Sequence, residues 1–156
     1  MSPHSAGILL FRYHGEALEV LLIHPGGPFW ENRDLGAWSM PKGLLEDDEN
    51  LLDAARREFE EETGFKVDGE FIDLGELKQP SGKIVHAFAL EGNIDSQDIK
   101  SNVFELEWPR HSGVIQTFPE VDQGEWFDLE TALNKIAPGQ RLFLDRLVAA
   151  TAKRLC

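Results

Sequence analysis

Three glutamates, Glu58, Glu61 and Glu62, stand at positions i, i+3 and i+4 of one segment. If the segment is helical, this spacing brings the three carboxylates to one face. Like charges placed side by side repel one another, and a carboxylate near an apolar stripe is costly to bury without a partner. A divalent cation relieves both costs, because Mg²⁺ accepts carboxylate oxygens and keeps further positions for water and substrate phosphate. The spacing therefore predicts a metal site.

The segment that carries these glutamates has the composition of a helix. From Asn50 to Thr63 it contains neither proline nor glycine, and leucine, alanine, glutamate and arginine dominate it, which predicts a helix. Gly64 follows directly and is expected to end the helix. Leu52, Ala55 and Phe59 fall on one stripe that should pack on the body of the protein, beside the face that carries the carboxylates.

A solvated acidic helix face is the alternative explanation of these glutamates. The chain has 28 acidic and 15 basic residues and a formal net charge of −13, and an isolated run of acids in such a chain would favour that alternative. Here, however, four further residues stand in fixed register with the glutamates, namely Gly43, Glu49, Arg57 and Gly64. The metal-site hypothesis is therefore preferred.

The whole segment has a recognisable form. Residues 43–65 read GLLEDDENLLDAARREFEEETGF, with Phe59 and Phe65 at two positions that require bulky apolar side chains. This segment resembles the Nudix box at every defined position, and weaker similarity extends over most of the chain. The resemblance to the Nudix hydrolase family implies hydrolysis of a nucleoside diphosphate linked to another group, by attack of water on one phosphorus of a pyrophosphate bridge. It also implies an α/β (α+β) fold, in which a mixed β-sheet is sandwiched between α-helices.

The resemblance further assigns roles within the box. Glu58, Glu61 and Glu62 would bind two or more Mg²⁺ ions, with Mn²⁺ as an alternative, and the backbone carbonyl of Gly43 would complete the metal site. Either Glu58 or Glu61 would polarise the attacking water. Arg57 would orient and neutralise the glutamates as part of the catalytic set. The structural residues of the box would be Gly43, Glu49, which would pair with Arg57, and Gly64.

Outside the box the candidates are weaker. A cation is needed to hold terminal phosphates, and Lys42 is the best candidate because it adjoins the box; the full set is Lys42, Lys78, Lys83 and Arg110. An additional acid for metal binding or base catalysis would come from Glu105, Glu107, Glu120 or Glu125, each of which has the alternative explanation of an exposed strand carboxylate. A nucleobase could stack on Tyr13, Phe29, Trp30 or Phe118, for which core or rim packing is the alternative.

Two flanking signals bear on the substrate. Residues 38–43 read WSMPKG. This segment, which leads into the box, is similar to the corresponding segment of Nudix enzymes that act on dinucleoside polyphosphates, diphosphoinositol phosphates or 5′-triphosphate RNA ends. Pro80 lies 15 residues past Phe65, where a proline is associated with ADP-ribose pyrophosphatases, although Pro80 also suits a turn. We expect a nucleoside or dinucleoside polyphosphate, with ADP-ribose or a nucleotide sugar as the alternative and a nucleotide-sensing binding module as the non-enzymatic alternative.

Composition excludes other classes of protein. The acidic charge argues against broad nucleic-acid binding, which needs a basic surface, and no stretch approaches the roughly 20 apolar residues of a membrane span. The single cysteine, Cys156, fits a reducing cytoplasm. The five histidines show no metal-ligand spacing, so a zinc site is not expected. The partner would be a small nucleotide; a homodimer is compatible with the family.

The remaining elements must position the box within a single domain, residues 1–156. A hairpin is expected from residues 6–12 and 18–24, and further strands over 38–40, 67–78, 84–90, 102–108 and 124–128. Helices are expected over 128–135 and from Pro138 to about Lys153. The predicted order is a group of strands followed by a helix, twice over, without a regular βαβ repeat. This order predicts a mixed sheet.

Overall fold

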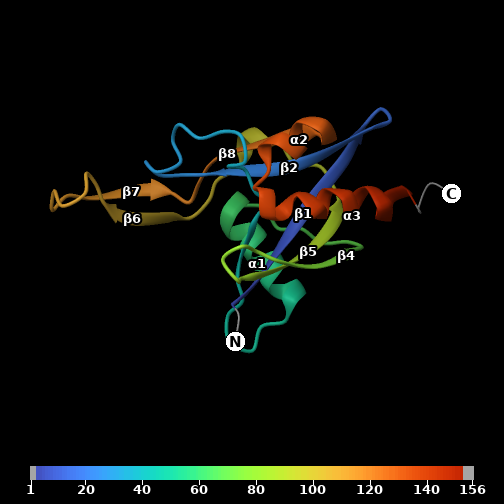
Figure 1. The fold of residues 1–156 in the computed structure, drawn as a ribbon, viewed down its shortest axis with the longest axis horizontal. Coiled ribbons are helices and arrows are strands. Elements are labelled where there is room, and N and C mark those ends of the chain that lie inside the picture. The colour runs from blue at the N-terminus through green and yellow to red at the C-terminus, as the bar shows by residue number, and fades with distance from the viewer. Residues whose placement is uncertain (1–2, 153–156) are drawn as a thin grey trace.

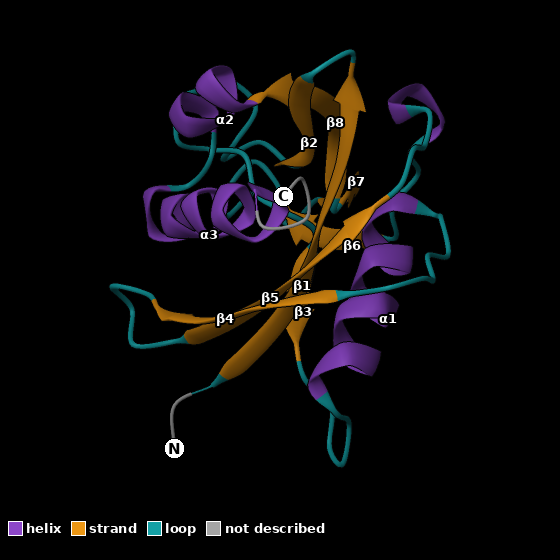
Figure 2. Ribbon diagram, turned by 90° about the vertical axis from the view of Figure 1, so that its right-hand side faces the viewer, coloured by secondary structure: helices purple, strands orange, loops and turns teal. Residues whose placement is uncertain are grey.

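The computed structural model describes residues 3–152, which form a mixed β-sheet between two layers of helix (Figure 2). The six-stranded sheet has the order β4-β5-β1-β2-β8, with β3 paired to β1; β1 and β5 are parallel and the other pairs antiparallel. The predicted fold class is thus confirmed. The elements are β1 (His4–His14), β2 (Ala17–Pro25), β3 (Lys42–Leu44), α1 (Leu51–Thr63), β4 (Ile72–Lys78), β5 (Ile84–Glu91), η1 (Ser96–Asp98), β6 (Val103–Glu107), β7 (Ile115–Pro119), β8 (Val121–Asp128), α2 (Leu129–Lys135), η2 (Pro138–Gln140) and α3 (Arg141–Ala152).

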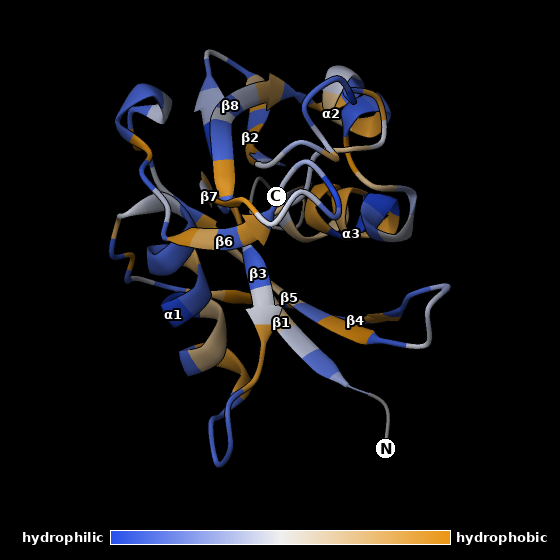
Figure 3. Cartoon of the chain, turned by 90° about the vertical axis from the view of Figure 1, so that its left-hand side faces the viewer, coloured by the Kyte–Doolittle hydropathy of each residue, from blue (hydrophilic) through white to orange (hydrophobic). Residues whose placement is uncertain are grey.

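The central strand β1 is buried on both faces, which explains its continuous apolar run. Successive side chains of a strand point to opposite faces, so Ile8 and Leu10 pack in the cluster under α1, whereas Leu9 and Phe11 pack in the cluster under α3. α1 and α3 both show hydrophilic and apolar residues in the hydropathy view (Figure 3), as expected for helices that cover a sheet. One face of the sheet therefore provides the apolar surface on which α1 packs.

The helix predicted over residues 50–63 is confirmed as α1. Asn50 is the N-cap and its side chain accepts a hydrogen bond from the Asp53 backbone N–H at 2.8 Å. Gly64 adopts the left-handed conformation, with φ of 81°, and donates its N–H to the Glu60 carbonyl. Phe59 is fully buried against the sheet, so the helix can turn only slightly about its axis.

The strand predicted at residues 38–40 is wrong, and the pairing strand is instead β3, Lys42–Leu44. Trp38 and Ser39 form only isolated bridges, because each pairs with a different segment and neither pairing continues into a ladder. The N–H of Trp38 donates to the Lys135 carbonyl, while Ser39 exchanges bonds with Ile23 of β2. β4 also begins later than predicted, at Ile72, and the last helix is divided into η2 and α3.

The hairpin of β6 and β7 was only half predicted. Its two strands pair with each other and form a separate two-stranded sheet that extends away from the main body (Figure 1). The expected alternation in β6 is present, since Val103, Glu105 and Glu107 are exposed while Phe104 and Leu106 are partly buried. β7 was not predicted. Among the described residues, no helix has the length and apolar character needed to cross a membrane.

Candidate functional site

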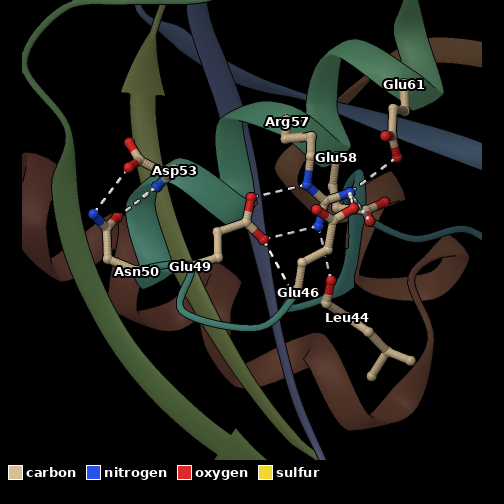
Figure 4. A network of polar contacts seen from close by, with 8 residues as sticks. All are labelled: Leu44, Glu46, Glu49, Asn50, Asp53, Arg57, Glu58 and Glu61. Carbon is tan, nitrogen blue, oxygen red and sulfur yellow. Dashed lines mark hydrogen bonds and ion pairs between the residues drawn. The ribbon is translucent and has the colours of Figure 1, made fainter.

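Arg57 of α1 is the centre of a network of charged groups (Figure 4). Its guanidinium donates to both carboxylate oxygens of Glu49, at 2.9 and 3.0 Å, so the predicted ion pair with Glu49 is present. It also donates to Glu58 at 2.8 Å, to Glu61 at 3.2 Å and to the Leu44 carbonyl at 2.9 Å. The hydrogen bonds that Arg57 donates to Glu49 raise the pKa of Arg57 further above its usual range. Arg57 therefore ties the loop after β3 to the helix.

Replacing Arg57 with alanine is expected to lower the free energy of unfolding by about 1–3 kcal/mol, because several charge-assisted hydrogen bonds are lost and Glu58 is left without its cation. The neighbouring Arg56 is the matched control. Arg56 is exposed and lies 4.0 Å from the carboxylate of Asp68, so Arg56→Ala should change stability by less than about 0.5 kcal/mol. Urea unfolding of both variants measures the difference; equal losses would contradict the assigned structural role of Arg57.

Glu58 lies directly against the backbone of β3. A Cβ added to Gly43 would stand 2.1 Å from the Glu58 carboxyl carbon, so only glycine leaves room for the carboxylate here. The Glu58 side chain is 14% exposed. Burial raises its pKa, and the hydrogen bond from Arg57 opposes that rise without cancelling it.

Glu62 is the most perturbed acid of the site. Burial, and then repulsion from Glu58, raise the pKa of Glu62 to about 8, although it accepts a hydrogen bond from the Lys42 backbone N–H at 3.2 Å. Burial conversely lowers the pKa of the Lys42 ammonium. Glu62, Lys42 and Glu120 line one cavity of about 180 Å³. The negative charge gathered here is therefore not neutralised by the protein's own cations.

Glu58 links the other two acids of the helix. Glu58 and the 36% exposed Glu61 both accept hydrogen bonds from Arg57, and Glu58 and Glu62 lie close enough to repel each other and are both influenced by Glu120. Across residues 3–152, no three acid, histidine or cysteine side chains are already arranged as a metal cage. The donors are all oxygens and their charge is unbalanced, which suits a hard divalent cation that draws the carboxylates together as it binds.

The other predicted cations lie at different places. Repulsion from the Lys83 ammonium also lowers the pKa of Lys42, so these two lysines are neighbours. Lys78 ends β4 and pairs with Ile84. Arg110 lies in the turn between β6 and β7, with its guanidinium 5.0 Å from the Phe29 ring centre. The structure thus places Lys42 in the cavity and Arg110 on the hairpin.

Of the additional acids, Glu120 is the one that lines the cavity with Glu62. Glu105 and Glu107 lie on the exposed face of β6, and the carboxylate of Glu107 accepts the His111 backbone N–H at 2.9 Å. Glu125 lies on β8, where it pairs with Leu22.

The aromatic residues considered for stacking of a nucleobase lie in different parts of the fold. Tyr13 lies six residues beyond Gly7, which pairs with Lys42, so it is roughly 20 Å along β1 from the box. Phe118 packs on Phe104, ring centres 6.0 Å apart. Phe29 and Trp30 are exposed, and Phe29 contacts Trp108 at 5.4 Å between ring centres. Sequence analysis missed Trp108, whose place in an alternating strand suggested only packing.

Two of the histidines, His24 and His86, lie beside carboxylates. Buried His24 lies 2.8 Å from Asp122 and 2.6 Å from the Arg33 carbonyl oxygen. His86 lies 2.6 Å from Asp73. Each therefore links two segments of the fold.

Comparison with known sequences gives a consistent result. The sequence model of the NUDIX domain matches residues 1–147. The chain is 30% identical to an RNA pyrophosphohydrolase of Bartonella henselae over 143 residues, which cover 81% of this chain and 76% of that protein. It is 28% identical to Nudix hydrolase 6 of Arabidopsis thaliana over 86% of this chain, and 36% identical to an octanoyltransferase of Myxococcus xanthus over 65% of it. The chain spans only 42% and 25%, respectively, of the lengths of these last two proteins.

Solved structures share the fold. A C. elegans Ap4A hydrolase in a binary complex has a TM-score of 0.65 and 22% identity, covering 96% of this chain and 98% of that one. The NUDIX domain of Shewanella oneidensis NrtR, crystallised with ADP ribose, has a TM-score of 0.63 and 19% identity, covering 100% of this chain and 90% of that one. Identities this low establish similarity of fold alone.

Proposed function

The chain belongs to the Nudix family, and from that premise we propose that it hydrolyses a pyrophosphate bond in a nucleoside or dinucleoside polyphosphate with the help of a divalent metal ion. The observation that carries the proposal is the cavity at the end of α1. There the carboxylates of Glu62 and Glu120 adjoin the ammonium of Lys42, and Glu58 lies against Gly43. Carboxylates for a metal and a cation for phosphate are thus brought to one place.

The metal would be held by Glu58 and Glu62, with the Gly43 carbonyl, and Glu61 and Glu120 would join after small side-chain movements. Mg²⁺ is the expected ion, and Mn²⁺ would suit the same oxygens. When bound, the ion would neutralise the pyrophosphate oxygens and lower the pKa of a water ligand. Glu58 or Glu61 would accept the proton of the attacking water, and both accept a hydrogen bond from Arg57.

Lys42 would contribute on the substrate side. Its ammonium is partly buried beside Glu62, so it is positioned to contact an anionic phosphate when the carboxylate charge is taken up by metal. Lys83, its neighbour, would add to the positive potential at the same edge. The chain's net charge of −13 makes such local cations necessary for attracting a polyphosphate.

The substrate class rests on two kinds of support. The WSMPKG segment that leads into the box resembles the corresponding segment of enzymes acting on dinucleoside polyphosphates, among others. In addition, one solved structure with a similar fold is an Ap4A hydrolase. A second candidate, the 5′-pyrophosphate end of RNA, is favoured by the similarity to an RNA pyrophosphohydrolase. ADP-ribose hydrolysis is the alternative favoured by Pro80 and by the fold neighbour crystallised with ADP ribose.

The test is phosphate release across a panel of Ap4A, Ap3A, nucleoside triphosphates, ADP-ribose, nucleotide sugars and a 5′-triphosphate oligonucleotide, first with Mg²⁺ and then with EDTA. We expect a dinucleoside or nucleoside polyphosphate to be turned over fastest and EDTA to stop the reaction. Tight binding of a nucleotide without any metal-dependent turnover would instead favour a nucleotide sensor.

The same site predicts how the stability of the metal-free protein depends on pH. A carboxyl pKa of about 8 in the folded protein, against 4.5 for the ordinary group, means that the folded state binds more protons between these two values. The free energy of unfolding should therefore fall as pH rises from about 4.5 to about 8, by up to about 5 kcal/mol, and should level off above that range.

Thermal unfolding in EDTA from pH 5 to pH 9 measures this dependence, and excess Mg²⁺ should restore much of the lost stability at pH 8–9 by binding the folded state. Glu62→Gln is the control, because it removes the titrating group while other acids still repel one another. An equal decline in that variant would attribute the effect to general repulsion.

A further inference from the structure

An aromatic pair with a cation beside it lies between the loop after β2 and the β6–β7 hairpin. The rings of Phe29 and Trp108 meet edge to face at 5.4 Å, and the Arg110 guanidinium stands 5.0 Å from the centre of the Phe29 ring. Phe29 is 46% exposed. A large aromatic surface thus remains open to solvent beside a positive charge.

The composition of this cluster favours a ligand that is both aromatic and anionic. Next to Phe29, Trp30 is also exposed, and the Arg33 guanidinium lies 5.5 Å from its ring centre. Two of the 15 basic residues of an acidic chain therefore lie over neighbouring exposed rings. Aromatic faces bind nucleobases by stacking, and guanidinium groups bind phosphate oxygens.

The cluster is attached to the candidate active site by short backbone connections. Gly26 donates its N–H to the Glu120 carbonyl at 2.9 Å, and Asn102, at the start of the hairpin, donates to the Glu61 carbonyl at 2.9 Å. Phe29 follows Gly26 by three residues, so their Cα atoms are at most about 11 Å apart, and Trp108 follows Asn102 by six residues, roughly 20 Å along β6. A dinucleoside polyphosphate with its phosphates in the cavity would have to span an interval of this order for its second base to reach the cluster.

We propose that Phe29, Trp108 and Arg110 form a subsite for the second nucleobase of a dinucleoside polyphosphate. The assignment rests on the proposed function and adds to it, because it explains how a substrate with two bases would be preferred over one with the same phosphate chain and one base. The second base would stack on the face of Phe29 opposite the Arg110 guanidinium, with Trp108 against the ring from the side. Arg110 contacts the phosphate next to that base.

The test compares Ap4A with adenosine 5′-tetraphosphate, which has the same number of phosphates and only one base. Phe29→Leu should raise KM for Ap4A by about 5- to 50-fold, the effect of losing one stacked base, with kcat and the KM for adenosine tetraphosphate nearly unchanged. Arg110→Gln, which removes a phosphate contact, should raise KM for both nucleotides. Both side chains are exposed, so the fold should tolerate either change. Tyr13→Leu is the control, because Tyr13 is similarly exposed at 38% but lies far along β1.

Three results would overturn the subsite. In Phe29→Leu, KM for the two nucleotides could rise equally, which would show that Phe29 does not recognise the second base, or KM for Ap4A could stay unchanged. A larger effect on a 5′-triphosphate oligonucleotide than on Ap4A would assign the cluster to RNA. If the parent protein hydrolyses no nucleotide, the proposed function fails separately, and the subsite is then judged by binding. In that case Ap4A, and not adenosine tetraphosphate, should shift the indole N–H resonance of Trp108 in the presence of Mg²⁺, and absence of that shift would reject it.

Discussion

Glu62→Gln is expected to lower kcat by a factor of about 10² or more on whichever nucleotide the parent protein hydrolyses best, because it removes a carboxylate proposed to hold the metal. Glutamine has nearly the same size and can still accept the hydrogen bond from the Lys42 backbone N–H, so the fold should be kept. The same variant should be more stable than the parent in EDTA at pH 9, where the parent carries a partly buried charge repelled by Glu58. Loss of activity together with gain of stability distinguishes a functional acid from a structural one.

The control for this variant comes from the same run of glutamates. Glu60→Gln makes the same change in charge two residues away, but Glu60 lies beside Arg56 and Lys66 on another side of α1. It should leave kcat within about two-fold of the parent. Should Glu62→Gln and Glu61→Gln both retain the parent's rate with Mg²⁺, the assignment of the metal site to these acids would be wrong.

Gly43→Ala should have a comparable effect on activity for a purely steric reason. The added methyl group would stand 2.1–2.5 Å from three atoms of the Glu58 carboxyl group, so that carboxylate must move away from β3. We expect a loss of about 10²-fold in kcat, because a displacement of about 1 Å of a catalytic group costs this much. The loss in the free energy of unfolding should be smaller than the rise in activation free energy, because the displaced Glu58 carboxylate can turn toward solvent. Steady-state kinetics and urea unfolding measure the two effects.

Gly92→Ala is the matched control, because Gly92 is another glycine without a left-handed conformation. A Cβ there would meet only the end of the Leu10 side chain, at 3.1 Å, which can adjust. It should leave kcat near that of the parent. If Gly43→Ala behaved in the same way, Glu58 would not need its position against the β3 backbone, and its proposed part in metal binding would be refuted.

The helix and its network were predictable because their signals are local. Asn50, Gly64 and the apolar stripe that contains Phe59 define α1 within a window of fifteen residues, and capping and periodicity act over that distance. The pairing of Glu49 with Arg57 joins residues eight apart in sequence. It was predicted from the family resemblance, since spacing alone does not determine how a loop folds back on a helix.

The features that depend on distant segments were harder to predict. Glu120 reaches Glu62 because β8 pairs with β2 and the hairpin is bonded to the end of α1, and no local pattern separates Glu120 from Glu105 or Glu107. β7 was missed because most of its side chains are exposed, so its sequence lacks the alternation of a half-buried strand. Trp108 acquires its neighbours Phe29 and Arg110 only through folding of two separate loops.

The attachment of the β6–β7 hairpin has a consequence for protein engineering. Besides the contacts of Trp108 and Arg110 with Phe29, main-chain bonds near Asn102 and Glu120 join the hairpin to the main body. Main-chain bonds do not depend on which side chains the strands carry. Residues 103–119 can therefore be exchanged as a cassette between these two anchor points while α1 and its acids stay in register. Substrate range and catalytic chemistry would then be separately adjustable, by grafting hairpins of different sequence onto one unchanged catalytic helix.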